Sequence, residues 1–185
     1  MNPEILRYCQ VESPVGRLNL AASERGLALL EFARPSFPPK RGPFAHASWG
    51  EAPEEMGLYT AQLEEYFDGR RRKFSFPLDL RGTDFQLRCW HALLEIPYGQ
   101  IRTYGDIARQ IGRPGAFRAV GMANHDNPIA IVVPCHRVVA SNHSLCGYGG
   151  GLATKQFLLE LEGLRVDGAG RVKTESSLFD QAVAS

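Results

Sequence analysis

Apolar residues in the first 80 positions gather in short runs that predict strands and turns. The runs at 17–22 and 27–32 predict the two strands of a hairpin, because the Ser-Glu-Arg-Gly sequence between them is typical of a turn. Apolar and polar residues alternate over 74–80, which predicts a third, half-buried strand. Four prolines within 33–50 predict a loop. We therefore expect residues 1–80 to form a small α/β domain built on hairpins.

Helical spacing first appears over 56–67, and the Asp-Gly pair at 68–69 would end that helix. From residue 81 onward the pattern is mainly helical. A second helix is predicted to begin after Thr83, because Gln86 stands three residues later as in a capping box. Cys89 lies on the apolar stripe of this helix, so we expect it in the core.

Two further short helices are predicted around a tight turn. Thr103 and Asp106 form another capping-box pattern, and the glycine- and proline-containing sequence at 112–115 ends the helix that follows. A second short helix is predicted over 116–123. This arrangement is typical of a helix-turn-helix, although many helical hairpins never contact DNA.

The second of these short helices carries small residues around one long cation, Arg118. The small residues are Ala116, Ala119, Gly121 and Ala123. They would let the helix backbone approach a groove closely, while the Arg118 guanidinium enters the base stack or reaches a phosphate. The alternative is that they pack against another helix and that Arg118 is a surface charge.

The candidate chemistry lies where a cysteine and a histidine follow a buried run. The apolar residues 129–133 predict a short buried strand, and Pro134, Cys135 and His136 come directly after it. A free cysteine titrates near pH ~8.5, so a nucleophilic thiol needs a neighbouring base at neutral pH. The alternative is an inert structural cysteine, since free cysteines are often buried.

The composition of the 185 residues fits a globular protein of one or two small domains, with 44% hydrophobic and 22% charged residues. No apolar stretch approaches the ~20 residues of a membrane span, and the N-terminus lacks the layout of a signal peptide. The four cysteines include no Cys-x-x-Cys pair, which argues against a zinc ribbon or a redox dithiol. We expect reduced thiols and a cytoplasmic protein.

The net charge of +1 is unevenly distributed along the chain. Residues 81–165 carry nine basic and six acidic groups, a balance that is compatible with nucleic-acid binding but does not prove it. The cationic run at 70–73 lies outside this segment and is either a solvated turn or a phosphate contact. Residues 166–185 are polar, and we expect a flexible tail there.

Several motifs occur in order over residues 74–163 and resemble one protein family. They are Ile96-Pro97-Tyr98-Gly99, Thr103-Tyr104-Gly105-Asp106, Arg118-Ala119-Val120-Gly121, Asn127-Pro128, Pro134-Cys135-His136-Arg137-Val138, Gly147-Tyr148-Gly149-Gly150 and Glu162-Gly163. On these motifs the chain resembles the O6-alkylguanine-DNA alkyltransferases, also called methylated-DNA–protein-cysteine methyltransferases. The resemblance implies an α+β fold: a ribonuclease H-like domain with an antiparallel sheet over 1–80, and a helical, winged helix-turn-helix-like domain over 81–165.

The resemblance also implies a repair reaction that consumes the protein. The protein would bind double-stranded DNA through the minor groove, rotate an O6-alkylguanine out of the stack and accept its alkyl group on Cys135, with no cofactor and no metal. His136 would act as the base through a water, and Glu162 would orient its imidazole. Tyr104 would protonate the leaving guanine, and Asn127 would tie the turn before the cysteine. Repair of O4-alkylthymine and the range of alkyl sizes stay open.

The remaining residues implied by the resemblance belong to the base pocket and to the DNA surface. Pro134, Val138, Tyr148 and Gly149 would line the pocket. Arg118 would fill the gap left by the flipped nucleotide. Further DNA contacts would come from Thr103, Ala116, Ala119 and Gly121. We expect a monomer with no membrane partner.

Two features depart from the family pattern. Ala130 stands where many members have a second proline, and the loop at 142–146 is less typical and ends in Cys146. Cys146 is either a second oxidisable thiol near the pocket or a small space-filler. Some relatives bind zinc in the N-terminal domain, but no comparable Cys/His cluster appears here.

Two other classes of protein compete with this interpretation. A damage-recognition protein of the same fold would flip the base without transferring the alkyl group, but such relatives lack the acceptor cysteine that stands here at 135. A helix-turn-helix regulator with an incidental cysteine would leave His136, Tyr104 and Glu162 unexplained.

Overall fold

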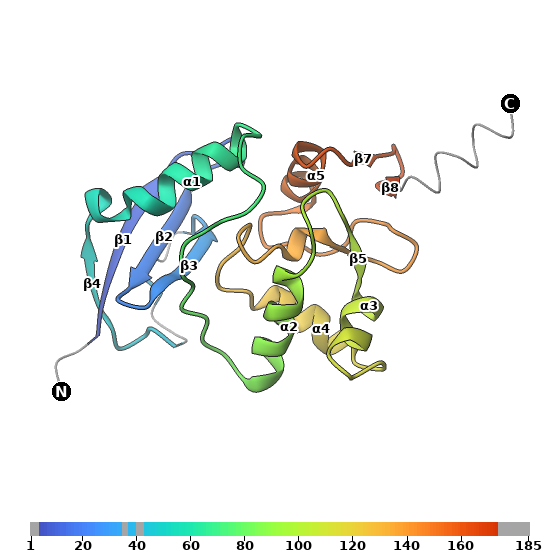
Figure 1. Ribbon diagram of the computed structural model, residues 1–185, viewed down its shortest axis with the longest axis horizontal. Helices are drawn as coiled ribbons and strands as arrows, with labels where there is room; N and C mark the ends of the chain where they lie inside the picture. Colours follow the sequence, from blue (N-terminus) through green and yellow to red (C-terminus); the bar gives the residue numbers. More distant parts are fainter. Residues whose placement is uncertain (1–3, 35–36, 40–42, 174–185) are drawn as a thin grey trace, which may run out of the picture.

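The N-terminal part of the chain is built on a four-stranded sheet (Figure 1). The computed structural model describes residues 4–34, 37–39 and 43–173. The strands are β1 (Ile5–Val11), β2 (Leu18–Ser23), β3 (Gly26–Phe32) and β4 (Ser48–Glu51) in the order β3-β2-β1-β4. β1, β2 and β3 are antiparallel, which confirms the predicted hairpin. β4 pairs with β1 in parallel, so the sheet is mixed at this edge, and its residues are strand where a loop was predicted.

One helix packs against this sheet at the predicted position. A 3-10 turn, η1 (Pro53–Met56), leads into α1 (Gly57–Phe67), whose buried Tyr59, Leu63 and Tyr66 join the core with the β2 leucines. The helix ends at Asp68, and Gly69 takes a φ of +72° that favours glycine.

Residues 74–80 are extended but do not form the predicted strand. Only Leu78 makes a bridge to the sheet, to Leu27. Pro77 has no N–H to donate, and its carbonyl accepts from the Leu27 amide at 3.0 Å. A Cβ on Gly26 would lie 2.3 Å from that carbonyl oxygen, so the close approach requires glycine.

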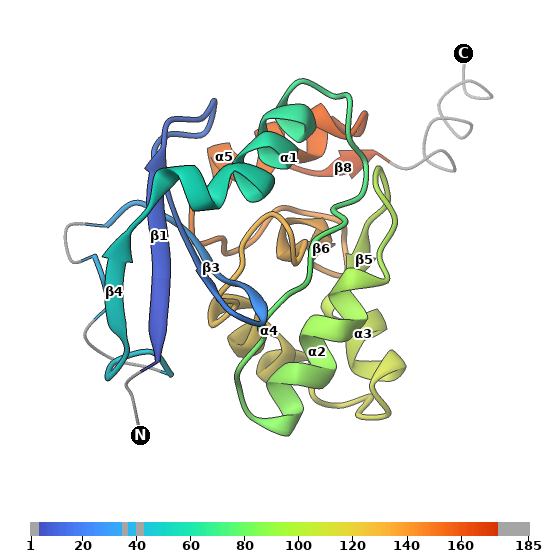
Figure 2. The same ribbon diagram turned by 60° about the vertical axis from the view of Figure 1, so that its left-hand side comes forward.

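The C-terminal part is helical, and three of its helices pack together (Figure 2). They are α2 (Asp84–Leu94), α3 (Tyr104–Gln110) and α4 (Phe117–His125). Both predicted capping boxes are present, at Thr83 with Gln86 and at Thr103 with Asp106. A further helix, α5 (Leu152–Leu161), was not predicted from the pattern.

The apolar run at 129–133 is buried, but it forms tight turns and not the predicted strand. The amides of Val132 and Val133 donate to the carbonyls of Ala130 and Ile129, at 2.8 and 2.9 Å. Ile131 has a φ of +70°, which no regular strand accommodates. The buried backbone groups are therefore satisfied locally, and a short 3-10 turn, η2 (Cys135–Arg137), carries the cysteine.

The two parts of the chain share one core and meet beside this turn. The Leu30 amide on β3 donates to the Pro128 carbonyl, and the Ala130 amide donates back to Leu30. Because β3 is hydrogen-bonded to the segment just before Cys135, the N-terminal sheet helps to fix the position of the thiol.

The end of the described chain folds back as a small antiparallel hairpin of β7 (Arg165–Val166) and β8 (Val172–Lys173). A second short pair, β5 (Arg102–Thr103) with β6 (Val138–Val139), is parallel. Val172 is buried, so the tail expected from residue 166 is folded as far as Lys173. Its remainder, 174–185, lies outside the described residues. Over the described parts of the chain, no helix has the length and apolar character needed to cross a membrane.

Candidate active site

The Cys135 thiol lies in a crowded polar setting at the start of η2. Its side chain is 8% exposed, and its Sγ accepts a hydrogen bond from Asn127 Nδ2 at 3.2 Å. Burial raises the pKa of this thiol, while the Asn127 hydrogen bond and the charge of Lys155 act in the opposite direction. The thiol therefore needs a base to become a nucleophile at neutral pH.

Asn127 ties together the turn that leads to the cysteine. Besides the thiol, its Nδ2 donates to the Val133 carbonyl at 2.8 Å, and its Oδ1 accepts from the Ile129 amide at 3.1 Å. These bonds link the end of α4 to the backbone directly before Cys135. Asn127 therefore bonds to the backbone on both sides of the turn between α4 and Cys135, as expected for the hinge asparagine.

His136 is fully buried, and only one of its two ring nitrogens has a hydrogen-bond partner among the described residues. Its Nε2 lies 2.9 Å from Glu162 Oε1. With Nε2 donating to that carboxylate, Nδ1 is the acceptor nitrogen, and it has no hydrogen-bond partner among the described residues. Burial lowers the pKa of His136 against the opposing effect of Glu162, so the ring is neutral and able to accept a proton.

Glu162 is the hub of a buried network. Its carboxylate accepts two hydrogen bonds from the Arg137 guanidinium, both 2.8 Å, one from the Tyr66 hydroxyl at 2.8 Å and one from the Gly99 amide at 3.0 Å. Burial by itself would raise the pKa of Glu162, but the hydrogen bonds and charges of His136 and Arg137 lower it to about 2. Glu162 is therefore ionised at neutral pH.

Acid should destabilise the protein through this carboxylate. Because the folded-state pKa lies below the unfolded value, the stabilisation is present above the unfolded pKa and is lost as the pH falls through the folded pKa. We expect about 3 kcal/mol of the unfolding free energy to disappear between about pH 5 and pH 2. Urea unfolding measured at a series of pH values tests this. In Glu162→Gln the unfolding free energy should depend correspondingly less on pH. An identical pH dependence in both proteins would contradict the assignment.

Tyr104 occupies the first position of α3. Its hydroxyl accepts a 3.7 Å hydrogen bond from the Cys146 thiol, and burial raises its pKa. A Cβ on Gly121 of α4 would lie 3.9 Å from the Tyr104 ring, so α4 passes close to the phenol. The phenol is thus protonated at neutral pH and lies beside the helix predicted to contact DNA.

Lys155 is buried, and it holds two backbone segments of the site together. Its Nζ donates to the carbonyls of Val138 and Cys146, at 2.6 and 2.9 Å. Burial lowers the pKa of this ammonium group. The charge still favours the thiolate of Cys135, and the two bonds fix the loop between β6 and α5.

The cavity at Cys135 is much smaller than a nucleobase site. It measures about 50 Å³, against the 300–1,000 Å³ of typical ligand pockets, and is lined by residues from β3, from α4 and from the loop before α5. Tyr148 closes it by packing edge-on against Phe32, with ring centroids 5.6 Å apart. Cys135, Asn127 and Gly149 also line the cavity. Pro134 instead lines a larger pocket, and Val138 lines neither.

Helix α4 presents the predicted mixture of small and cationic residues. Arg118 and Ala119 are exposed, Ala116 and Gly121 are half-buried, and Ala123 is buried. Arg118 forms no ion pair within the described residues and lies 5.8 Å from the Phe117 ring. Thr103 caps α3 through its side chain, so its hydroxyl serves the helix end.

Three members of the network were not singled out as site residues in the sequence: Arg137, Lys155 and Tyr66. In the sequence Tyr66 contributes only to the helical spacing over 56–67, yet its hydroxyl reaches Glu162, 96 positions away. No local pattern could have paired them. Among the described residues, no group of three or more His, Cys, Asp or Glu side chains could hold a metal ion.

Comparison with known proteins finds relatives over most of the chain. A family model for the ribonuclease-like domain of 6-O-methylguanine DNA methyltransferase matches residues 6–80, and one for its DNA-binding domain matches residues 84–164. The methylated-DNA–protein-cysteine methyltransferase of Mycobacterium bovis is 46% identical over 176 residues, covering 95% of this chain and all of that protein. The protein of the same name in Methanosarcina acetivorans is 49% identical over 84% of this chain and 97% of its own length.

A solved structure is also similar. Mycobacterium tuberculosis OGT in complex with DNA superposes with a TM-score of 0.77 and 49% identity, covering 85% of this chain and 93% of that one. The same combination of sheet and helical parts is therefore present in a protein that was crystallised on DNA.

Proposed function

This chain belongs to the 6-O-methylguanine DNA methyltransferase family, and from that premise we propose that it repairs DNA by moving an alkyl group from the O6 of guanine to Cys135 in one irreversible step. The observation that carries the proposal is the buried His136–Glu162 pair directly beside a cysteine in a cavity under α4. An inert core cysteine would have no use for an ionised carboxylate and a neutral imidazole with one unpartnered nitrogen.

The reaction begins with removal of the Cys135 proton. We assign this role to His136 Nδ1, acting through one bridging water, with Glu162 holding the imidazole and stabilising its cationic form. The sulfur then attacks the alkyl carbon, an S–C bond forms, and the C–O bond breaks with its electron pair moving to guanine O6. The product is a thioether, which is not hydrolysed, so each protein acts once.

The departing guanine needs a proton or a hydrogen bond as its negative charge develops. Tyr104 is the proposed donor, because its hydroxyl is protonated and lies beside α4. The carbonyl of Val138, held by Lys155, and the Tyr148–Gly149 backbone form the proposed walls around the base. Pro134, directly before the cysteine, lines the neighbouring pocket.

A base cannot reach the sulfur in the closed arrangement. We expect the cavity of about 50 Å³ to widen when a base enters, with Tyr148 and Phe32, which pack edge-on in its lining, moving apart. The movement would separate the loop before α5 from β3. Binding of DNA against α4 would supply the free energy for it, since an everted base gains contacts only after the pocket opens.

Helix α4 is the proposed minor-groove element. Its exposed Ala119 and half-buried Ala116 and Gly121 let the backbone approach a narrow groove, and Arg118 is free to occupy the space of the flipped nucleotide. Thr103 would approach the DNA backbone at the start of α3. The DNA partner is a duplex that contains O6-alkylguanine.

Replacing Arg118 with Ala should separate flipping from chemistry. Without the guanidinium the everted state loses a few kcal/mol, so repair of O6-methylguanine in a duplex should slow by about 10–100-fold. Reaction with free O6-benzylguanine needs no flipping and should keep its rate. Rapid-quench kinetics on both substrates measures this, with Arg17→Ala as a control of equal charge on the N-terminal sheet. Equal slowing on both substrates would contradict the role.

We propose further that the chain divides into domains at 1–80 and 81–165 and acts in the cytoplasm as a monomer. The ranges of the two family matches support the division. All four cysteines are free, as a thiol reagent requires, which supports a reducing compartment.

The number of methyl groups transferred per protein chain tests the proposed function. Incubation with an excess of duplex DNA carrying radiolabelled O6-methylguanine should transfer one methyl group per protein chain and then stop. Continued turnover would contradict a reaction that consumes the protein. Tight binding without any transfer would instead establish a damage-recognition protein.

A further inference from the structure

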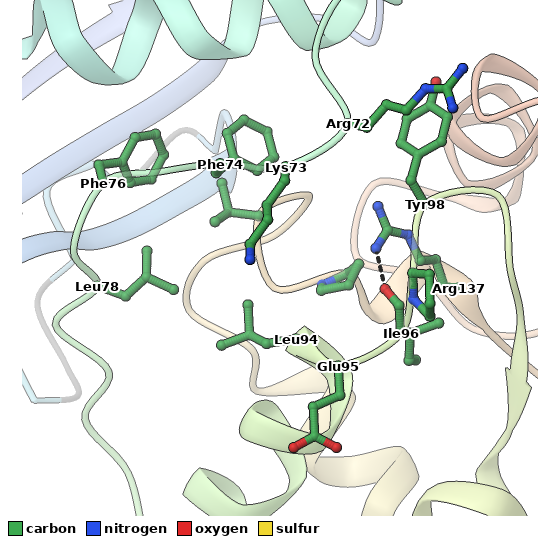
Figure 3. A pocket seen from close by; sticks show the side chains of 13 residues that line it. Arg72, Lys73, Phe74, Phe76, Leu78, Leu94, Glu95, Ile96, Tyr98 and Arg137 are labelled. Atoms are coloured by element: carbon green, nitrogen blue, oxygen red, sulfur yellow. Dashed lines mark hydrogen bonds between the residues drawn. The ribbon is translucent and has the colours of Figure 1, made fainter.

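A second, much larger pocket lies where the two halves of the chain meet (Figure 3). It measures about 830 Å³, within the range of small-molecule sites, and shares no lining residue with the cavity at Cys135. One wall is the extended segment 72–78, and the other is the end of α2 with the residues after it, 94–98. Val132, Pro134 and Arg137 form its floor.

Two cations at the rim of this pocket have no counter-charge. Arg70 and Arg71 of the same cationic run pair with Asp68 and Glu65, each at 2.6 Å. Arg72 and Lys73 have no carboxylate within ion-pair distance in the described part of the chain. Figure 3 shows the Lys73 ammonium pointing into the space between the two walls. The run therefore divides into two neutralised cations and two without a carboxylate partner, of which Lys73 points into the pocket and Arg72 lies at its rim beside Tyr98.

The one acidic residue of the pocket is turned away from it. Glu95 accepts a hydrogen bond from Gln110 on α3, and its carboxylate points away from Lys73 in Figure 3. Arg137, on the floor, is already neutralised by Glu162. The net field at the mouth of the pocket is therefore positive and comes from Arg72 and Lys73.

The walls below these cations are apolar and partly aromatic. Phe74, Phe76, Leu78, Leu94 and Ile96 line them. Leu94 remains 38% exposed and is one of seven large apolar side chains that are exposed among the described residues. The Arg72 guanidinium lies over the Tyr98 ring, 5.5 Å from its centroid, and this cation–π contact holds the guanidinium at the rim.

We propose that this pocket binds a small organic anion with an aromatic body, such as an aryl carboxylate, sulfonate or phosphate. The head group would pair with the Lys73 ammonium, with Arg72 adding positive charge at the rim, and the rings would cover Leu94 and the phenylalanine side chains. Such a ligand would touch Pro134 and Arg137, the neighbours in sequence of Cys135 and His136. The proposal does not depend on the alkyl-transfer reaction.

A DNA phosphate fits these observations less well than a small molecule. Phosphate contacts need cations on a surface that a duplex can reach, but these two cations stand over a concave apolar wall. A sugar-phosphate backbone would leave that wall uncovered, whereas an aromatic body removes it from water.

Fluorescence titration with 1-anilinonaphthalene-8-sulfonate tests the proposal on the native full-length protein. We expect saturable binding of one dye per chain, and weaker binding of the uncharged analogue N-phenyl-1-naphthylamine by about tenfold or more. The double variant Arg72→Gln/Lys73→Gln should weaken binding of the sulfonate by a similar factor. The matched variant Arg70→Gln/Arg71→Gln, with the same change of charge, should leave it unchanged.

A second variant tests the apolar wall. Leu94→Glu places a negative charge on an exposed position that tolerates it, and it should abolish binding of the sulfonate without lowering the melting temperature. Leu58→Glu, at a more exposed apolar position on α1 outside the pocket, should bind as the native protein does. Equal effects of the two charge-neutralised doubles, undiminished binding by Leu94→Glu, or a loss confined to duplex-DNA affinity would each overturn the proposal.

Discussion

Cys135→Ala is expected to lose alkyl transfer completely while keeping its fold and its affinity for damaged duplex DNA. The side chain is small, and only the Asn127 hydrogen bond to the thiol is lost. No other cysteine can replace it. Cys9 and Cys89 are buried in the core, where burial raises the pKa of Cys89 to about 11, and the half-buried Cys146 donates its thiol hydrogen bond to the Tyr104 hydroxyl.

The measurement is transfer of label from O6-methylguanine in a duplex, with binding followed separately by fluorescence anisotropy. Cys9→Ala, which also removes a buried thiol, should transfer at the native rate. Cys135→Ser should be nearly inactive, because a hydroxyl is a far weaker nucleophile at neutral pH than a thiolate. Residual stoichiometric transfer by Cys135→Ala would place the acceptor elsewhere.

Glu162→Gln is expected to damage both stability and chemistry. The amide keeps the size of the side chain but leaves the Arg137 guanidinium buried without a counter-charge, which should cost about 3–5 kcal/mol. It also removes the negative charge that stabilises protonated His136, so transfer by the folded protein should slow by about 10²–10⁴-fold.

The two effects can be separated experimentally. Rates are measured well below the melting temperature, and their pH profile is compared with that of the native protein, since a purely structural defect would leave the profile unchanged. Glu160→Gln, an exposed carboxylate two positions earlier on α5, should match the native protein in both assays. Native rates in folded Glu162→Gln would show that the carboxylate has no part in the reaction.

Local signals in the sequence identified the elements that depend on neighbouring residues. Both capping boxes, α1 with its Asp-Gly end, and the β2–β3 hairpin are set by side chains within a few positions of one another, and all are present. The Cys135–His136 pair could be found because the two residues are adjacent.

Other features depend on contacts between distant segments. An apolar run cannot distinguish a buried strand from buried turns, and the positive φ of Ile131 is imposed by the pairing of 128–130 with β3. The Glu162 network joins Tyr66, Gly99 and His136 from three segments, and the closed cavity depends on Phe32 of the N-terminal sheet. Local sequence patterns predict none of these contacts.

The most direct test of the account locates the transferred group within the chain. The native protein is incubated with duplex DNA containing O6-methylguanine, digested, and sequenced by tandem mass spectrometry. We predict an added mass of one CH₂ group on the peptide that contains Cys135, with the sulfur of that residue as its site, and unmodified peptides for Cys9, Cys89 and Cys146. A methyl group on any other residue, or an unmodified chain after the lesion has disappeared from the DNA, would contradict it.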